Sequence, residues 1–445
     1  MPILSKDAAQ ALLKKVLAYS KADECEVSIF GGDSGNVRYA RNEVSTSGAN
    51  SKNMLVVNAA FGKKLGTATI NEFDDASLEK VVRRAEELAR LAPENPEYMP
   101  VLGPQQYAAA ADCYNKDTAA IDPAFRADAV AKSLAITKQN KLVAAGYLEN
   151  NTGFSAIMNS KGLFAYHDST QVNFSITVRS EDGTGSGYAS KAYNDVRKLD
   201  VSKDTSIAAQ KATGSKGAKA IEPGKYTVIL EPAASIVLIE QLINSMDARS
   251  AEEGRSFLSK AGGKTKLGDK LMDEQVTIYS DPWHPDMPTA YYNNDGRPQE
   301  KITWIDKGTV KNMFYSRYWA QKDNVKAIPG PDGFIMEGGN ASLEELIKST
   351  EKGILVTRLW YIRPVDPQTL LFTGLTRDGT FYIENGAIKH PVKNFRFNES
   401  PVIMLNNVEA LGIPERAVSG ESGQSAILPP MKLRDFTFTS LSDAI

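Results

Sequence analysis

The first part of the chain alternates between two spacings of apolar side chains, one typical of helices and one typical of strands. After Ser5, a residue type that often caps a helix N-terminus, apolar residues recur at helical spacing over residues 8–17. Residues 24–30 then alternate strictly, with Cys25 on the apolar side, which predicts a strand. Further strands are expected at 36–39, 54–57 and 66–70, and a second helix from about 75 or 77 to Pro93.

The middle of the chain repeats this rhythm. Asp122-Pro123 precedes an amphipathic helical pattern over residues 124–138, with proline in the first turn, where it is tolerated. Four strand-like runs follow, separated by polar turns such as Asn150-Asn151, and they predict an antiparallel meander. The runs cover residues 142–149, 153–159, 162–168 and 172–180, and a third helix is expected over 201–213. The repetition indicates one large α+β unit with a meandering sheet, in contrast to a doubly wound parallel sheet.

The pattern changes after Pro223-Gly224. A strand is expected at 226–230, and a buried helix at 234–246, because the latter segment is apolar over most of its surface. Short strand-like runs follow, separated by turn sequences such as Asn294-Asp295-Gly296 and Glu384-Asn385-Gly386. Examples of these runs are 275–279, 302–305, 354–362, 380–383 and 387–390.

These elements predict an α+β fold. An N-terminal α+β region with a meandering antiparallel sheet and helices is followed by a β-rich C-terminal domain. The expected boundaries are 1–104 for an N-terminal subdomain, 105–222 for a middle subdomain with the meander, and 223–445 for the C-terminal domain.

Composition and charge exclude several classes of protein. The 445 residues are 42% hydrophobic and 24% charged, which is typical of a globular protein with two or three domains. The formal net charge of -2 gives no reason to expect direct nucleic-acid binding, which usually needs a basic surface. No apolar run reaches the roughly 18 residues of a membrane span, so we expect no membrane contact.

The N-terminal residues lack the basic and then apolar pattern of a signal peptide, so we expect a cytoplasmic protein. Its two cysteines, Cys25 and Cys113, are then expected to be reduced. Cys113 follows Asp112, whose negative charge should raise the thiol pKa and argues against a nucleophile.

Several ordered sequence blocks stand out in the C-terminal half. They are Asp295-Gly296-Arg297-Pro298 with residues 302–308, Glu337-Gly338-Gly339-Asn340 with residues 343–347 and 353–356, and Tyr382-Ile383-Glu384-Asn385-Gly386 before Pro391-Val392-Lys393. In order and spacing these blocks resemble the TldD/TldE family, whose TldE members are also called PmbA or modulator of DNA gyrase. The N-terminal half is similar to that family in size and rhythm only.

The resemblance implies a two-chain cytosolic zinc peptidase that trims unfolded peptides. In TldD-like chains the zinc ligands are the two histidines of His-Glu-x-x-x-His and a later cysteine, and the glutamate acts as general base. In this chain Ile239 and Asn244 stand at the histidine positions, Glu240 is retained, and Arg377 stands near the cysteine position. Ile and Arg offer zinc no lone pair. We therefore expect no catalytic residue and no metal in this chain, and zinc in a TldD-like partner.

Aromatic residues gather between residues 283 and 319, in segments expected to be loops and strand ends. Such a set suits a peptide-binding or subunit interface, and it equally suits packing inside a β domain. The candidates for substrate or interface contact are Trp283, Tyr291, Tyr292, Trp304, Tyr318, Trp319 and Arg358. His284, in a turn with Asp281 and Asp286, is a weak candidate for a metal ligand.

Three functions remain open at this point. The chain could be a TldE/PmbA-like non-catalytic subunit that pairs with a TldD-like chain, or with itself, and contacts unfolded peptide. It could be a self-sufficient peptidase with a different metal site near His284, or a non-proteolytic protein that modulates a target such as DNA gyrase. The first hypothesis is favoured because it explains the loss of ligand residues together with the retention of the surrounding blocks.

Overall fold

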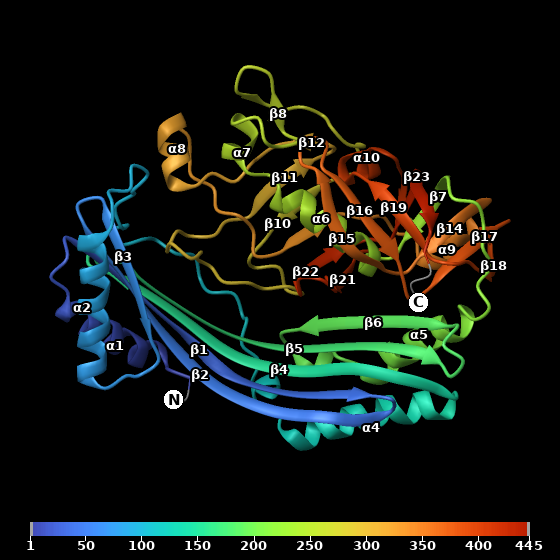
Figure 1. Cartoon of the computed structure of the whole chain (residues 1–445), viewed down its shortest axis with the longest axis horizontal. Coiled ribbons are helices and arrows are strands. Elements are labelled where there is room, and N and C mark those ends of the chain that lie inside the picture. Colours follow the sequence, from blue (N-terminus) through green and yellow to red (C-terminus); the bar gives the residue numbers. More distant parts are fainter. Residues whose placement is uncertain (1–2, 443–445) are drawn as a thin grey trace.

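The computed structural model describes residues 3–442, and its first half is built on one long antiparallel sheet (Figure 1). Its elements are α1 (Lys6–Tyr19), β1 (Glu24–Ala40), β2 (Glu43–Phe61), β3 (Lys64–Ile70), α2 (Asp75–Leu91), α3 (Lys116–Ala119), α4 (Pro123–Gln139), β4 (Leu142–Asn159), β5 (Phe164–Ser180), β6 (Ser186–Tyr193), the 3₁₀ turn η1 (Val196–Lys198) and α5 (Val201–Gly214). The strands form a six-stranded sheet in the order β3-β2-β1-β4-β5-β6. Strands from both expected N-terminal subdomains therefore share one sheet, and the division between those subdomains stays a prediction.

The turn expected at Asn150-Asn151 is wrong, because β4 runs through it without a break. Asn150 pairs with Gly35 of β1 on one side and with Val172 of β5 on the other. Its side chain accepts a hydrogen bond of 2.7 Å from Arg126 Nη1 of α4. Both the backbone and the side chain of this buried asparagine are thus satisfied inside the sheet, so its usual preference for turns is overridden. β5 likewise joins two runs that were expected to be separate strands.

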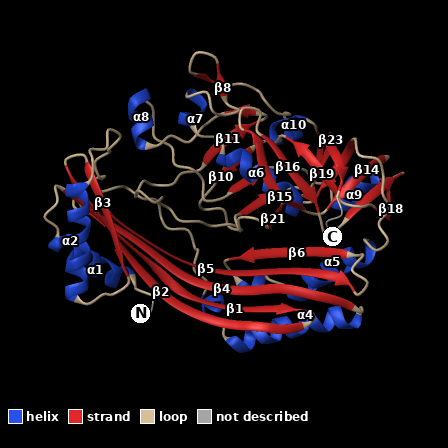
Figure 2. Cartoon of the chain, viewed as in Figure 1, coloured by secondary structure: helices blue, strands red, loops and turns tan. Residues whose placement is uncertain are grey.

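The helices cover only one face of this sheet. α1 and α2 pack over one end, against residues such as Val27 and Leu55, and α4 and α5 pack over the other end, against residues such as Val37 and Phe174. In Figure 2 the blue helices accordingly lie along one side of the long red strands. We call the opposite side the inner face. Its residues alternate with the buried ones along each strand, and most are polar.

The chain after residue 222 forms two further sheets around one buried helix (Figure 1). One sheet has the order β12-β11-β10-β13-β22-β21, and the other has the order β15-β16-β19-β23-β7-β14-β17-β18 with β20 paired to β23. The elements are β7 (Lys225–Leu230), α6 (Pro232–Asn244), α7 (Ala248–Glu252), β8 (Ser259–Lys260), β9 (Lys264–Thr265), β10 (Ile278–Ser280), β11 (Ile302–Asp306), β12 (Thr309–Val310), α8 (Arg317–Asp323), β13 (Phe334–Met336), α9 (Leu343–Lys348), β14 (Lys352–Val356), β15 (Leu359–Asp366), β16 (Leu371–Thr376), β17 (Thr380–Glu384), β18 (Ala387–Pro391), β19 (Phe395–Glu399), α10 (Pro401–Asn406), β20 (Val408–Leu411), β21 (Glu415–Val418), β22 (Ser425–Leu428) and β23 (Met431–Leu441).

The predicted α+β class is confirmed, with helices and a long sheet first and a strand-rich part afterwards. The single strand expected over residues 354–362 is wrong. Those residues form β14 and β15, which belong to the same sheet but are separated by four other strands. The break falls at Thr357 and Arg358, which are buried and bonded to Asp378 and Gly379. No helix in residues 3–442 is long and apolar enough to cross a membrane.

We predict that Gly66→Ala destabilises the fold. β3 lies so close to α2 that a Cβ on Gly66 would sit 2.2 Å from both Ala85 O and Ala89 N. Since those are backbone atoms, the helix must shift, and we expect a loss of about 3 kcal/mol in the free energy of unfolding, measured with urea. Gly103→Ala is the control, because a Cβ on Gly103 meets no atom within 4 Å. Equal stability of the two variants would contradict the prediction.

Candidate functional site

The helix that carries the degenerate motif is the central buried element of the C-terminal part. α6 packs against β15 of one sheet and against β21 and β22 of the other. Ile239 is completely buried in the core, whereas Asn244 is exposed as the last residue of the helix. Glu240 is only 5% exposed, and within the described chain its carboxylate forms no hydrogen bond or ion pair.

These residues do not fit a zinc ion. Ile239 presents only an alkyl group, and Arg377 presents a guanidinium that lies 3.8 Å from Asp378 and 5.5 Å from the Trp360 ring centroid. Zinc in proteins takes Cys, His and carboxylate ligands in a tetrahedral arrangement. Of all the His, Cys, Asp and Glu side chains in residues 3–442, no three are grouped so that they could hold a metal ion. Glu240 is thus the one group of the motif that could still act chemically.

A buried ion pair lies beside this helix, where the first sheet meets the C-terminal part. Arg358 Nη1 donates a hydrogen bond of 2.6 Å to Asp378 Oδ2, and Asp378 is completely buried. Ser186 Oγ of β6 donates to the other carboxylate oxygen at 2.5 Å. The Arg358 guanidinium also stacks 3.6 Å from the ring centroid of Tyr188, another β6 residue. We call this group the Asp378 joint.

The Asp378 joint includes two residues that the sequence did not reveal. Arg358 was expected to contact substrate or a partner, and here it connects two parts of its own chain. Asp378 and Ser186 are 192 positions apart, and no local spacing links them. Ser186 belongs to the glycine-rich stretch at residues 183–187. Thr184, Ser186 and Asp378 also line an adjoining cavity of about 390 Å³.

The aromatic candidates fall into separate groups. Tyr291 and Tyr292 form an edge-to-face cluster with Tyr107, and the Tyr292 hydroxyl lies 2.8 Å from Ser155 Oγ on the inner face of the sheet. Trp304 is fully buried in the C-terminal core, and Tyr318 packs at its border. These aromatic residues therefore supply packing, and Tyr291 and Tyr292 form a second joint between the sheet and the C-terminal part, which we call the tyrosine joint.

Trp283 and Trp319, at the two ends of the aromatic segment, each donate a hydrogen bond to another residue of this chain. Trp319 is 5% exposed and donates from Nε1 to Glu252 at 2.9 Å, and Trp283 donates from Nε1 to Ala109 O at 2.7 Å. Their use in binding a substrate or partner stays a prediction.

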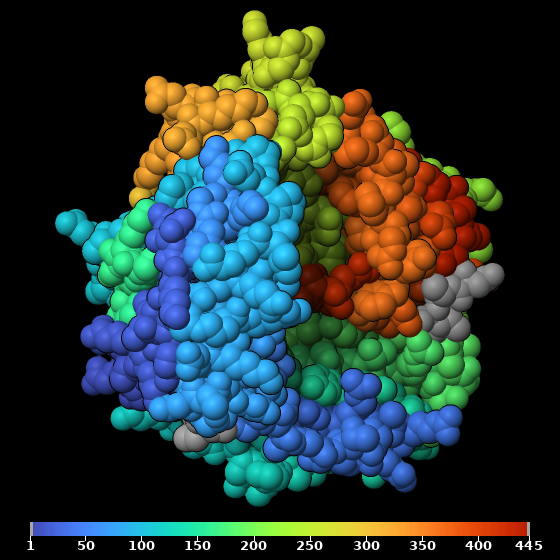
Figure 3. Space-filling model, turned by 60° about the vertical axis from the view of Figure 1, so that its left-hand side comes forward, coloured from blue at the N-terminus to red at the C-terminus, as the bar shows by residue number. Residues whose placement is uncertain are grey.

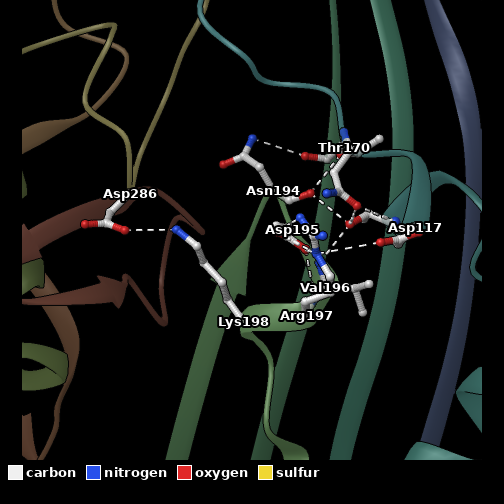
Figure 4. Close-up of polar contacts among 10 residues, drawn as sticks. Asp117, Thr170, Asn194, Asp195, Val196, Arg197, Lys198 and Asp286 are labelled. Carbon is white, nitrogen blue, oxygen red and sulfur yellow. Dashed lines mark hydrogen bonds and ion pairs between the residues drawn. The ribbon is translucent and has the colours of Figure 1, made fainter.

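His284 lies in a turn whose two carboxylates point to other groups. Asp286 pairs with Lys198 at 2.9 Å, and Asp281 pairs with Lys301 at 3.3 Å. Figure 4 shows Lys198 reaching from η1 across to Asp286, next to a cluster in which Arg197 binds Asp195 and Asp117. This turn therefore contributes a third contact between the long sheet and the C-terminal part. The contact is exposed, since the Lys198 side chain is 43% exposed and the Asp286 side chain is 64% exposed.

Cys113 is buried beside these contacts, with Sγ 3.4 Å from Thr289 O. Burial, and to a smaller degree Asp112, raises the pKa of the thiol to about 12. The predicted direction of that shift is confirmed.

The inner face of the long sheet extends from the tyrosine joint to the Asp378 joint. Over the centre of the sheet lies a depression of about 580 Å³, where Gly32 pairs with Gly153 and neither carries a side chain. Its rim is polar and includes Asn50, Lys52, Glu149, Asn151 and His167. In the space-filling view a hollow opens between the blue N-terminal elements and the orange and red C-terminal strands (Figure 3). Such a surface offers many hydrogen-bonding groups beside the exposed ring of Phe30, which suits an extended polypeptide.

The geometry gives an α+β scaffold around a central buried helix, and within residues 3–442 it groups no three side chains that could hold a metal ion. Family comparison assigns nearly every part of this scaffold. The PmbA/TldA metallopeptidase domain 1 matches residues 25–89, the central domain matches 116–217, and the C-terminal domain matches 223–440. The chain belongs to the PmbA/TldD metallopeptidase family.

The individual relatives have low sequence identity to this chain. A metalloprotease of Methanothermobacter thermautotrophicus is 24% identical over 61% of this chain and 63% of its own length, so the match spans less than two thirds of that relative. A metalloprotease of Methanocaldococcus jannaschii is 21% identical over 87% of this chain and 89% of its own. The crystal structure of TldE from Thermococcus kodakarensis has the same fold, with a TM-score of 0.87 at 20% identity, covering 97% and 99% of the two chains.

We predict that Asp378→Ala is strongly destabilising. The substitution leaves the Arg358 guanidinium, which is 8% exposed, buried without its counter-charge, so we expect a loss of about 3–5 kcal/mol in the free energy of unfolding. Lys198→Ala breaks the exposed contact to Asp286 and should cost less than about 1 kcal/mol. Comparable losses for the two variants, measured by denaturant unfolding, would refute the assignment of Asp378 as the main joint.

We also predict a pH-dependent effect of Glu26, an inner-face residue of β1. Burial raises its pKa to about 7, the Asp295 charge adds to the rise, and Asn58 and Arg317 oppose it. The unfolded-state pKa is about 4.3, so the folded chain holds a proton that the unfolded chain releases between the two values. Stability is therefore lost as the pH rises through this window, by about 2–3 kcal/mol in total.

Glu26→Gln removes this penalty, so the variant should exceed the native chain in unfolding free energy at about pH 8, with a smaller excess at about pH 5. Glu43→Gln, at the exposed β1–β2 turn, is the control and should show no such trend. A constant difference between Glu26→Gln and the native chain across this range would contradict the prediction.

Proposed function

We propose that this chain is a TldE/PmbA-type, non-catalytic subunit of a cytoplasmic zinc peptidase that degrades unfolded peptides. A TldD-like chain would supply the zinc and the catalytic residues. The observation that carries this proposal is the helix α6, which keeps its place at the centre of the fold while Ile239, a core residue, stands where a zinc ligand would be needed. The fold shared with TldE of Thermococcus kodakarensis supports the choice of the TldE type.

This chain would contribute substrate contacts and a cavity wall. The inner face presents amide, hydroxyl and charged side chains along extended strands, and an unfolded peptide carries unpaired backbone donors and acceptors along its whole length. Hydrogen bonds of this kind hold a chain without selecting its sequence, which fits degradation of diverse unfolded peptides. Exclusion of folded proteins follows from the same requirement, because their backbone groups are already paired.

The decisive experiment measures peptidase activity on an unfolded peptide for this chain alone, for a TldD-like chain alone and for the two together, with metal content determined for each chain. We expect no stoichiometric zinc in this chain, no activity from it alone, and activity of the mixture well above that of the partner alone. Glu240→Gln in this chain should leave the mixture's activity unchanged, because Glu240 has no metal-bound water to activate. The equivalent substitution in the partner's His-Glu-x-x-x-His should abolish it.

Three results would overturn the proposal. Stoichiometric zinc together with activity of this chain alone would make it a self-sufficient peptidase. A mixture no more active than the partner alone would favour a non-proteolytic binding protein. Loss of the mixture's activity on Glu240→Gln would assign the retained glutamate a catalytic role, and the chain would then no longer be a purely structural subunit.

A further inference from the structure

A further polar cavity lies between the first half of the chain and the C-terminal part. It is distinct from the cavity beside Asp378 and from the depression on the inner face. It has a volume of about 320 Å³. One wall comes from β6 and α5, with Ser190, Lys191 and Asp204, and the other comes from the start of α6 and from β21, with Glu231 and Arg416. We call it the α5–α6 crevice. The positions of the degenerate motif, Ile239 to Asn244, do not line it.

Two ion pairs cross this crevice and neutralise four of its charges. Lys211 Nζ of α5 binds Glu231 at 2.6 Å, just before the first turn of α6. Lys191 Nζ of β6 binds Glu415 of β21 at 3.0 Å and also donates to Arg416 O at 3.2 Å. These two pairs connect the walls, and each charge in them has a partner. A ligand would therefore bind to the other polar groups of the lining.

Three polar groups of the lining have unmet hydrogen-bonding capacity. The Asp204 side chain is 4% exposed, and its carboxylate has no hydrogen bond or ion pair within residues 3–442. Arg416 Nε and Ser190 Oγ are buried and likewise lack a partner there, although Arg416 Nη1 donates to the Asp286 carbonyl. A buried charged group without a partner is costly, so natural structures usually supply one in the form of protein, water or ligand.

The electrostatics of the crevice agree with this reading. Burial raises the pKa of Asp204 to about 6 and lowers the pKa of Arg416, because neither charge is fully compensated by its surroundings. The positive charges of Lys191 and Lys203 oppose the rise at Asp204 without bonding to its carboxylate, and Arg416 Nε lacks an acceptor within the described chain. The first turn of α6 adds a positive potential at the crevice, and its N-cap residue, Glu231, makes no side-chain capping bond.

We propose that the α5–α6 crevice binds a small zwitterion of the α-amino-acid or dipeptide class. Its ammonium group would pair with Asp204, and its carboxylate would accept from the Arg416 guanidinium near the N-terminal end of α6. A volume of about 320 Å³ is at the lower end of the range for small-molecule sites, which matches ligands of this size. Because the walls come from both parts of the chain, a bound ligand would stabilise their contact. The proposal does not depend on the peptidase role.

The test is isothermal titration of the purified full chain with L-alanyl-L-alanine and with each of the common L-amino acids. We expect saturable binding of at least one of them with a Kd of about 1 mM or tighter. For the ligand that binds, the N-acetylated and the C-amidated forms, each of which lacks one of the two charges, should bind at least about tenfold more weakly. Absence of saturable binding by every compound would overturn the proposal, and so would equal binding of the blocked forms.

Variants locate the site. Asp204→Asn should weaken binding at least about tenfold while the chain stays folded, because the substitution removes an unpaired buried charge. Asp128→Asn is the matched control on α4, where the carboxylate is 63% exposed and pairs with Lys132, and it should leave the affinity unchanged. Binding that persists unchanged in Asp204→Asn would place the ligand elsewhere and refute the assignment. The blocked ligands test the same idea on the native chain, independently of any effect on folding.

Discussion

The buried ion pair between Arg358 and Asp378 is the contact that fixes how the two parts of this chain meet. Asp378 has no solvent contact, and its two oxygens are held by Arg358 of the C-terminal part and Ser186 of the long sheet. Such a pair contributes more to geometry than to net stability, because desolvation offsets much of the attraction. Its removal from either side would leave a buried charge, so the edge strand β6 must dock in one position. The crevice and the hollow exist because docking is confined to a few such joints.

The central helix illustrates how packing alone can hold an element at the centre of a scaffold. α6 is packed by strands of both C-terminal sheets, so it is needed for the core whether or not it binds a metal. A buried isoleucine at position 239 is compatible with that packing role and incompatible with zinc coordination. Membership of the PmbA/TldD metallopeptidase family therefore accounts for the architecture of this chain, whereas chemistry depends on the individual side chains of a site.

Docking of the two parts also explains where the perturbed carboxylates lie. Glu26 and Asp204 both sit on the first half of the chain at surfaces that the C-terminal part covers, and burial raises the pKa of each. Neither shift arises from local sequence, since the water is excluded by segments far away in the chain. Uncompensated carboxylates of this kind are retained at interfaces and binding sites more often than in cores. They make the contact between the two parts responsive to protons and to cationic groups.

The sequence by itself determined several elements: the amphipathic helix α2, the helix α4 with proline in its first turn, the alternating start of β1, the buried helix α6 and the Asn385-Gly386 hairpin. It also carried the family resemblance, on which the expectation of lost zinc ligands rests, because ligand chemistry is a property of residue type. Only the tertiary structure decided that Asn150 continues a strand and that residues 354–362 divide at Arg358. The tertiary structure also decided that Ser186 bonds to Asp378 and that Asp204 is buried. Each of these depends on partners distant in sequence, whose hydrogen bonds and exclusion of water override local preference.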